Sequence, residues 1–174
     1  RRVRKEMGGN ATAYVWDGND MVHEVRPDQG VTTWEFEPDT FAPVAKFEGD
    51  RRYGIVTDHL GTPLALFDEA GEVAWRAQLD VYGAAQTDVM KTPCPWRWPG
   101  QYEDEQIGLL YNRFRHYEAQ TDRYAQIDPI RLLNGIKSYQ YVSDPLLWID
   151  PLGLVQNGIY EFMEGAVDRY IGSS

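Results

Sequence analysis

The chain has 174 residues, and its 17 lysines and arginines stand against 27 aspartates and glutamates, so its formal net charge is −10. Such an acidic chain is a poor candidate for a protein that follows nucleic-acid phosphates, because those proteins carry a basic face. Cys94 is the single cysteine, which excludes a disulfide framework. Hydrophobic residues make up 43% of the chain and charged residues 25%, as in ordinary globular domains.

Short strands separated by turn signals dominate residues 1–90. The chain holds 23 aromatic residues (11 Tyr, 6 Trp and 6 Phe) beside 16 glycines and 10 prolines. Aromatic residues suit strands, whereas Gly and Pro end them. Asp17-Gly18 lies between two apolar runs and predicts a β-hairpin. Further strands are predicted at residues 30–36, 43–47, 52–58, 64–67 and 72–77. The fold is therefore expected to be mainly β, with repeated antiparallel hairpins that stack on one another.

A proline-rich link at residues 92–100 leads into a second, more irregular part, expected to span residues 91–154. There, residues 109–117 have the pattern of one strand, and residues 122–127 are its expected hairpin partner. Little helix is predicted, because Gly or Pro interrupts most windows longer than about 15 residues. One helical turn is considered at residues 104–109. In the link, Trp96 and Trp98 are expected to pack against the sheet rather than stack on a sugar or a partner.

Three Asp-Pro dipeptides, at residues 128, 144 and 150, lie within 24 residues of one another. An Asp-Pro pair ordinarily starts a turn. Two of the three, however, head similar pentapeptides, 128–132 and 150–154. Carboxylates held by the same local backbone shape could face each other and share a proton, which leaves one acid and one base. Such a pair could hydrolyse a peptide bond with an activated water, so Asp128 and Asp150 are the candidate catalytic residues.

Several motifs in a fixed order closely resemble the core-associated C-terminal region of Rhs/YD-repeat proteins. They are Asp58–Pro63, Pro99–Glu105, Gly108–Tyr117, Arg123-Tyr124 and Ile149–Leu154. The resemblance covers about residues 50–154, with repeat-like sequence before it. It implies a β-sheet shell of YD repeats that encloses a toxin, a plug formed by residues 91–154, and release of the toxin by aspartyl self-cleavage directly after the closing motif.

The resemblance also implies roles for individual residues. By this resemblance, Asp128 and Asp150 carry the catalytic carboxylates, and the scissile bond joins Leu154 to Val155. Pro151 and Gly153 belong to the supporting motif. One carboxyl group would activate water while the other protonates the leaving amide, in a single turnover. Arg131 stands where the family often has glycine, which puts the backbone geometry near Asp128 in doubt.

Residues 155–174 resemble the opening hairpin of a GIY-YIG nuclease domain, with Gly158-Ile159-Tyr160 and Tyr170-Ile171-Gly172 as its two strands. In that family the two tyrosines face a phosphodiester beside a metal. The alternative is an arbitrary aromatic hairpin. The later helices that supply an arginine and a glutamate are absent from this sequence, so we expect a truncated domain and a divalent metal only in a complete one.

No metal site or cofactor is expected within the chain itself, since its three histidines, His23, His59 and His116, lack metal-ligand spacing. The basic opening at residues 1–5 is expected to end a solvated strand, and no stretch has the roughly 20 apolar residues of a transmembrane helix. The chain is thus interpreted as a fragment of a longer polypeptide, without a membrane span and without direct nucleic-acid binding.

Two functions from different classes fit these features. The first is the C-terminal segment of an Rhs polymorphic toxin. Its expected partners are the rest of its own shell and toxin domain, an immunity protein and secretion components. Export from a bacterium, by type VI secretion or a cell-surface route, is implied by resemblance alone. The second is a non-catalytic cell-surface β-repeat module that binds glycan or protein through exposed aromatics. Carboxylates of Asp128 and Asp150 within hydrogen-bond reach of one another would favour the first, and widely separated, solvent-exposed carboxylates would favour the second.

Overall fold

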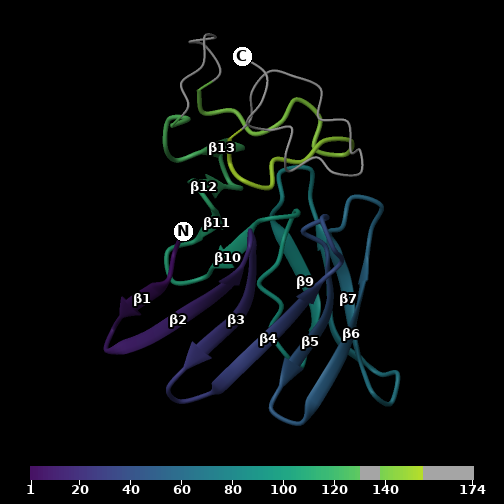
Figure 1. Ribbon diagram of the computed structural model, residues 1–174. Coiled ribbons are helices and arrows are strands. Elements are labelled where there is room, and N and C mark those ends of the chain that lie inside the picture. The colour runs from purple at the N-terminus through teal and green to yellow at the C-terminus, as the bar shows by residue number, and fades with distance from the viewer. Residues whose placement is uncertain (130–137, 155–174) are drawn as a thin grey trace.

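The computed structural model describes residues 1–129 and 138–154, which form two antiparallel β-sheets (Figure 1). The larger sheet is a meander in which each strand pairs with the next along the chain. Its strands are β1 (Arg4–Met7), β2 (Asn10–Asp17), β3 (Asp20–Arg26), β4 (Gly30–Phe36), β5 (Pro43–Glu48), β6 (Arg51–Thr57), β7 (Pro63–Asp68), β8 (Val73–Leu79) and β9 (Ala85–Met90). The smaller sheet contains β10 (Tyr102–Asp104), β11 (Leu109–Asn112), β12 (Arg115–Glu118) and β13 (Arg123–Tyr124). The expectation of a mainly β fold is confirmed, and these described ranges contain no helix.

The predicted strands of the larger sheet are confirmed, but one prediction in the smaller sheet is wrong. Residues 109–117 are a tight hairpin, β11 and β12, rather than one strand, because Arg113 has a φ of 49° and reverses the chain. β12 then pairs with β13. The helical turn considered at residues 104–109 is present as one isolated turn and does not continue into a helix. The amides of Ile107 and Gly108 donate to the Asp104 carbonyl (3.1 and 2.9 Å) in the turn between β10 and β11.

One kind of turn closes three successive hairpins between β6 and β9. In each, the Oδ1 atom of an aspartate accepts the amide hydrogens of the residues two and four positions later, at 2.8–3.0 Å. The glycine three positions later has a positive φ, which a residue with a side chain rarely adopts. These Asp-x-x-Gly turns begin at Asp58, Asp68 and Asp80. The aspartate thus satisfies backbone amides that the strands leave without a partner.

Residues 92–101, here called the crossing segment, return across the apolar face of the larger sheet. Trp96 lies edge-on to three aromatic rings, with centroids 5.8 Å from Trp34, 5.1 Å from Phe36 and 5.5 Å from Tyr102. Trp98 belongs to the core of the smaller sheet, where it stacks on Tyr141 at 4.9 Å. Packing of both tryptophans is confirmed, and the crossing segment joins the two cores.

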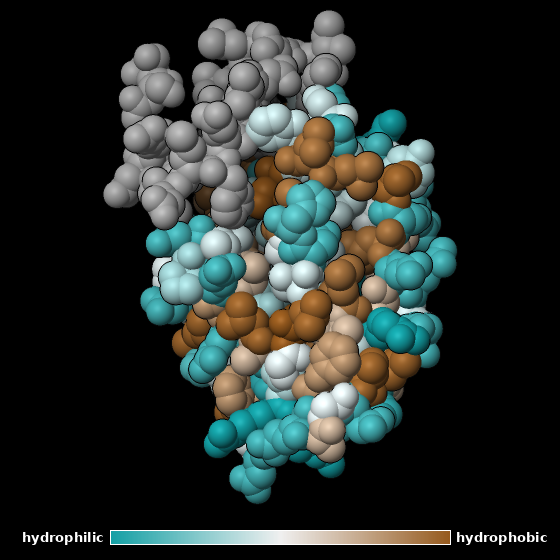
Figure 2. Space-filling view, turned by 90° about the vertical axis from the view of Figure 1, so that its right-hand side faces the viewer, coloured by the Kyte–Doolittle hydropathy of each residue, from teal (hydrophilic) through white to brown (hydrophobic). Residues whose placement is uncertain are grey.

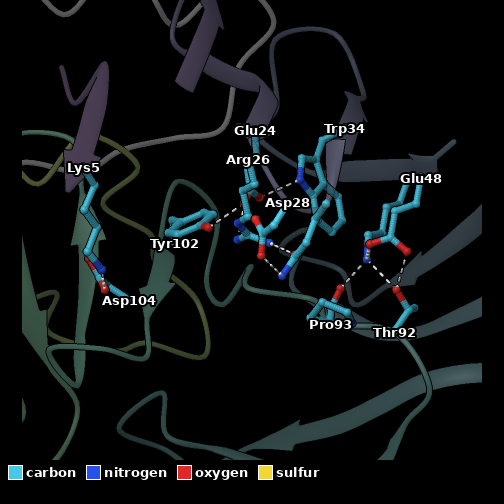
Figure 3. Close-up of polar contacts among 12 residues, drawn as sticks. Lys5, Glu24, Arg26, Asp28, Trp34, Glu48, Thr92, Pro93, Tyr102 and Asp104 are labelled. Atoms are coloured by element: carbon cyan, nitrogen blue, oxygen red, sulfur yellow. Dashed lines mark hydrogen bonds and ion pairs between the residues drawn. The ribbon is translucent and has the colours of Figure 1, made fainter. Parts of the chain in front are cut away.

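Polar side chains also fasten the crossing segment and β10 to the larger sheet (Figure 3). The buried Glu24 carboxylate accepts hydrogen bonds from Trp34 Nε1 (3.1 Å), Tyr102 Oη (2.9 Å) and Arg26 Nη2 (2.7 Å). The Lys46 ammonium donates to Thr92 Oγ1 and to the carbonyl oxygen of Pro93, both at 2.6 Å, and it pairs with Glu48. A cavity of about 370 Å³ borders this network. The buried charges around it are paired, so the network is a structural clamp.

Figure 2 shows apolar side chains gathered in several patches among polar ones on one side of the molecule. Exposed residues on successive strands include Val15, Val25, Val31, Val44 and Val56. β-Branched residues suit strands even on a solvated face. β1 and β9 are the two edges of the sheet. Edge strands present unpaired backbone groups to other chains, so we expect this chain to associate or aggregate when it is produced by itself.

Replacement of Gly100 by alanine should destabilise the protein more than the same change at Gly71. Both glycines have a positive φ (81° and 78°), which costs alanine about 1–2 kcal/mol. Gly71 faces open space, whereas a Cβ on Gly100 would lie 2.1 Å from the carbonyl oxygen of Pro151. We expect Gly100→Ala to cost about 2–3 kcal/mol more than Gly71→Ala in urea unfolding. Equal costs would show that residues 150–154 do not pack against the crossing segment.

Cys94 should react with a thiol reagent only after the crossing segment detaches. Its side chain is buried, and burial raises the pKa of the thiol to about 12, so almost no thiolate forms near pH 8. We expect labelling at least about 100-fold slower in the native protein than in urea. Rapid labelling of the native protein would contradict the packing described for this segment.

Candidate functional site

The turn at residues 150–154 places Asp150 against the hairpin of β11 and β12. Leu154 N donates to Asp150 Oδ1 at 2.8 Å, which is the same contact between residues four apart as in the three hairpin turns. Gly153 takes the glycine position of that turn, with a φ of 67°. A Cβ on it would lie 2.5 Å from the carbonyl oxygen of Asn112. The prediction that Asp-Pro starts a turn is therefore confirmed for Asp150-Pro151. The turn uses the Oδ1 atom of the Asp150 carboxylate.

The second oxygen of Asp150 lies in a buried polar cluster, and this distinguishes it from the aspartates of the hairpin turns. Asp150 is 2% exposed. Its Oδ2 atom accepts from Tyr124 Oη at 2.7 Å and from Arg115 Nη2 at 3.2 Å. One oxygen therefore shapes the local turn, while the other binds a hydroxyl and a cation.

Asp128 contacts the same cation as Asp150. The residue is 7% exposed, and its Oδ2 atom lies 3.2 Å from Arg115 Nη2, the nitrogen that also contacts Asp150. Because each distance is 3.2 Å, the two Oδ2 atoms cannot be more than about 6.4 Å apart. The structure thus brings together two side chains that are 22 positions apart in sequence, and one of them, Asp150, accepts the amide hydrogen of Leu154.

Arg115 organises the cluster, although no role was predicted for it from the sequence. It is 1% exposed, and its guanidinium carbon lies 3.5 Å from the centroid of the Tyr124 ring. Its Nε atom donates to the Gly153 carbonyl at 2.6 Å, and Nη1 donates to the Ser138 carbonyl at 3.3 Å. One feature of the sequence could have indicated this role. Arg115 and Tyr117 are two positions apart on β12, so both lie on its buried face. An arginine at such a position needs buried acceptors.

The other candidate residues divide into described and undescribed ones. Leu154 is buried, and Pro151 contacts the crossing segment through its carbonyl group. The following lie outside the described residues: Arg131, Val155, Tyr160, Tyr170 and Gly172.

Among the described residues, no three His, Cys, Asp or Glu side chains are grouped so that they could hold a metal ion. Within this part of the chain, no helix has the length and apolar character to cross a membrane. His23 bonds Thr33 Oγ1 (2.9 Å) on the neighbouring strand.

The fold and this site can now be compared with known proteins. Residues 53–88 match the family model described as RHS protein. The chain contains an Rhs region. Over 92% of its length it is 33% identical to double-stranded DNA deaminase toxin A of Burkholderia cenocepacia, covering 13% of that protein. It is also 33% identical, over 90% of its length, to the probable deoxyribonuclease RhsA of Dickeya dadantii, covering 12% of it.

A solved structure shares the fold of the Rhs region. The crystal structure of TcdB2-TccC3-TEV superposes with a TM-score of 0.64 over 87% of this chain and 8% of that one, at 17% identity. At this identity the similarity concerns the fold alone. The chain thus spans only about a tenth of the length of each of these three proteins.

Loss of the Arg115 guanidinium should destabilise the Rhs region in a pH-dependent way. Arg115→Met leaves two buried carboxylates without their shared cation, which should cost roughly 3–5 kcal/mol near pH 7. Burial and mutual repulsion then favour the protonated forms, so the loss should be smaller near pH 5, measured by urea unfolding. Arg76→Met is the control, because its pair with Asp88 is exposed and its removal should change little. A deficit independent of pH would contradict this account.

Proposed function

We propose that this chain is the segment of an Rhs polymorphic toxin that closes the encapsulating shell and cuts itself between Leu154 and Val155. Residues 1–90 supply YD-repeat hairpins of the shell. Residues 91–154 form the plug and the self-cleavage element, and residues 155–174 begin a GIY-YIG-like toxin domain. Cleavage frees the toxin from its shell inside or near a competing cell, after export from the bacterium.

One observation carries this proposal. Asp128 and Asp150 share the Arg115 guanidinium in a buried cluster, and Asp150 also accepts the amide hydrogen of Leu154. Two carboxylates therefore meet at one cation, and one of them, that of Asp150, is held against the residue that contributes the carbonyl of the scissile bond. A module that only binds a partner through exposed aromatics has no need of this arrangement, and Trp96 and Trp98 are buried.

The proposed chemistry is hydrolysis by an activated water. The ionised carboxylate takes a proton from water, and the hydroxide oxygen bonds to the Leu154 carbonyl carbon. The protonated carboxyl group gives its proton to the Val155 nitrogen as the carbon–nitrogen bond breaks. The products are a carboxylate at Leu154 and an amine at Val155. Because the bond belongs to the same chain, the fold itself sets its effective concentration, and one turnover suffices.

The relatives support a role in delivery rather than in toxic chemistry. One is named a DNA deaminase toxin and the other a deoxyribonuclease, yet both align with nearly the whole of this chain. Because these two proteins have different named activities, we assign neither activity to the region that they share. Holding and releasing a toxin is a task that both could share. A divalent metal and a nucleic-acid target would then belong to the complete toxin domain.

The proposal predicts that each aspartate is needed for cleavage. The 174-residue chain, refolded from denaturant and followed by intact mass, should separate into residues 1–154 and 155–174. Asp128→Asn and Asp150→Asn should each leave the chain uncut, with a rate at least about 100-fold lower. Asp68→Asn is the matched control, because Asp68 forms the same turn without a buried arginine, and it should cleave at the normal rate.

Normal cleavage in either the Asp128→Asn or the Asp150→Asn protein would overturn the catalytic assignment. Folding of each variant is checked by Cys94 labelling. A folded wild-type chain that never cleaves would instead favour the binding-module alternative.

A further inference from the structure

Tyr124 lies in the buried cluster but has no part in the proposed hydrolysis. It is 1% exposed, and its ring lies flat against the Arg115 guanidinium carbon at 3.5 Å. Its hydroxyl group is 2.7 Å from Asp150 Oδ2, the shortest of the hydrogen bonds described for that carboxylate. A buried hydroxyl so close to one of two candidate carboxylates can influence which of them is ionised.

The direction of this hydrogen bond follows from its neighbours. Asn112 Nδ2 lies 2.8 Å from the main-chain oxygen of Asp150 and 2.8 Å from Tyr124 Oη. A carbonyl oxygen only accepts, so the Asn112 atom that faces it must be the amide nitrogen. That nitrogen gives one hydrogen to the carbonyl and the other to the tyrosine oxygen. The single hydrogen of Tyr124 is then free to point at Asp150 Oδ2.

The hydroxyl keeps its proton in this setting. Burial, and after it the negative charge of Asp150, raise the pKa of Tyr124 well above its usual value. Tyr124 is therefore a fixed donor, and it acts together with Arg115 Nη2 and Leu154 N on the two oxygens of Asp150. Donors of this kind stabilise the ionised form of a carboxyl group.

We propose that Tyr124, oriented by Asn112, is a positioning residue that keeps Asp150 ionised, so that Asp150 is the base of the self-cleavage reaction. This assignment rests on the proposed function and deepens it. Asp150 removes the proton from the attacking water. The rate of cleavage should then fall at low pH, where Asp150 becomes protonated.

The test is the pH profile of cleavage, measured by refolding the 174-residue chain at a series of pH values and following intact mass. The low-pH limb is the part of the profile where the rate falls as Asp150 becomes protonated. In Tyr124→Phe this limb should shift to higher pH by about one unit, because one donor to the ionised carboxylate is lost. Tyr117→Phe is the matched control. Its hydroxyl is buried in the same core but bonds Asp122 and the Tyr82 carbonyl, so the limb should not move.

Two further measurements separate positioning from a structural role. Incorporation of 3-fluorotyrosine at position 124 keeps the shape of the side chain and makes its hydroxyl group a stronger hydrogen-bond donor. The low-pH limb should then shift to lower pH. The Asp150 carboxyl carbon, followed by NMR in the uncut Asp128→Asn protein, should titrate at higher pH when Tyr124→Phe is added. A purely structural role would lower the rate at every pH without moving the limb or this titration.

The outcomes distinguish the two levels of the proposal. If Asp150→Asn blocks cleavage but neither change at position 124 moves the limb, the role of Tyr124 is overturned and the self-cleavage function stands. If Asp150→Asn cleaves normally, the proposed function itself fails. Should Tyr124→Phe not fold, the fluorinated protein alone decides the matter through the sign of its shift.

Discussion

The structure depends on covering one face of a nine-stranded meander. Such a sheet is assembled from neighbours in sequence, and its inward aromatic residues need a partner that the hairpins themselves do not provide. The crossing segment is that partner in the described chain, with Trp96 set edge-on against rings of the sheet. Near its end, Gly100 allows the Pro151 carbonyl to approach closely. The packing of the larger sheet thereby fixes the place of the closing motif.

The site reuses a local structure that is common in this chain. The turn at residues 150–154 has the same aspartate-to-amide contact as the turns at Asp58, Asp68 and Asp80. An identical local shape cannot account for a special chemistry. The difference lies in the surroundings, since Asp150 presents its second oxygen to Arg115 and Tyr124. The turn only orients the carboxylate of Asp150. A function at this site would come from the residues that pack against the turn.

Much of the larger sheet was predictable because alternation and turn residues are local signals. Residues 109–117 were misread since alternation continues through Arg113, and only its positive φ reveals the reversal. The pairing of Asp128 and Asp150 could be guessed from their similar pentapeptides, whereas their shared cation could not. An arginine within an aromatic strand gives no sign of what lies opposite, because its acceptors come from residues 13 to 38 positions away.

Charge balance separates this cluster from the other buried charges. Glu24 meets Arg26, Lys46 meets Glu48, and Asp104 meets both Lys5 and Arg2. Among the described clusters, only the one around Arg115 sets two carboxylates against one cation. The two carboxylates meet at one nitrogen atom of Arg115, and Asp150 also accepts the amide hydrogen of Leu154. The paired charges of the larger sheet hold the crossing segment and β10 in place, whereas this cluster brings two acids together at the closing motif. That convergence is the physical reason to look for chemistry at this cluster rather than at the others.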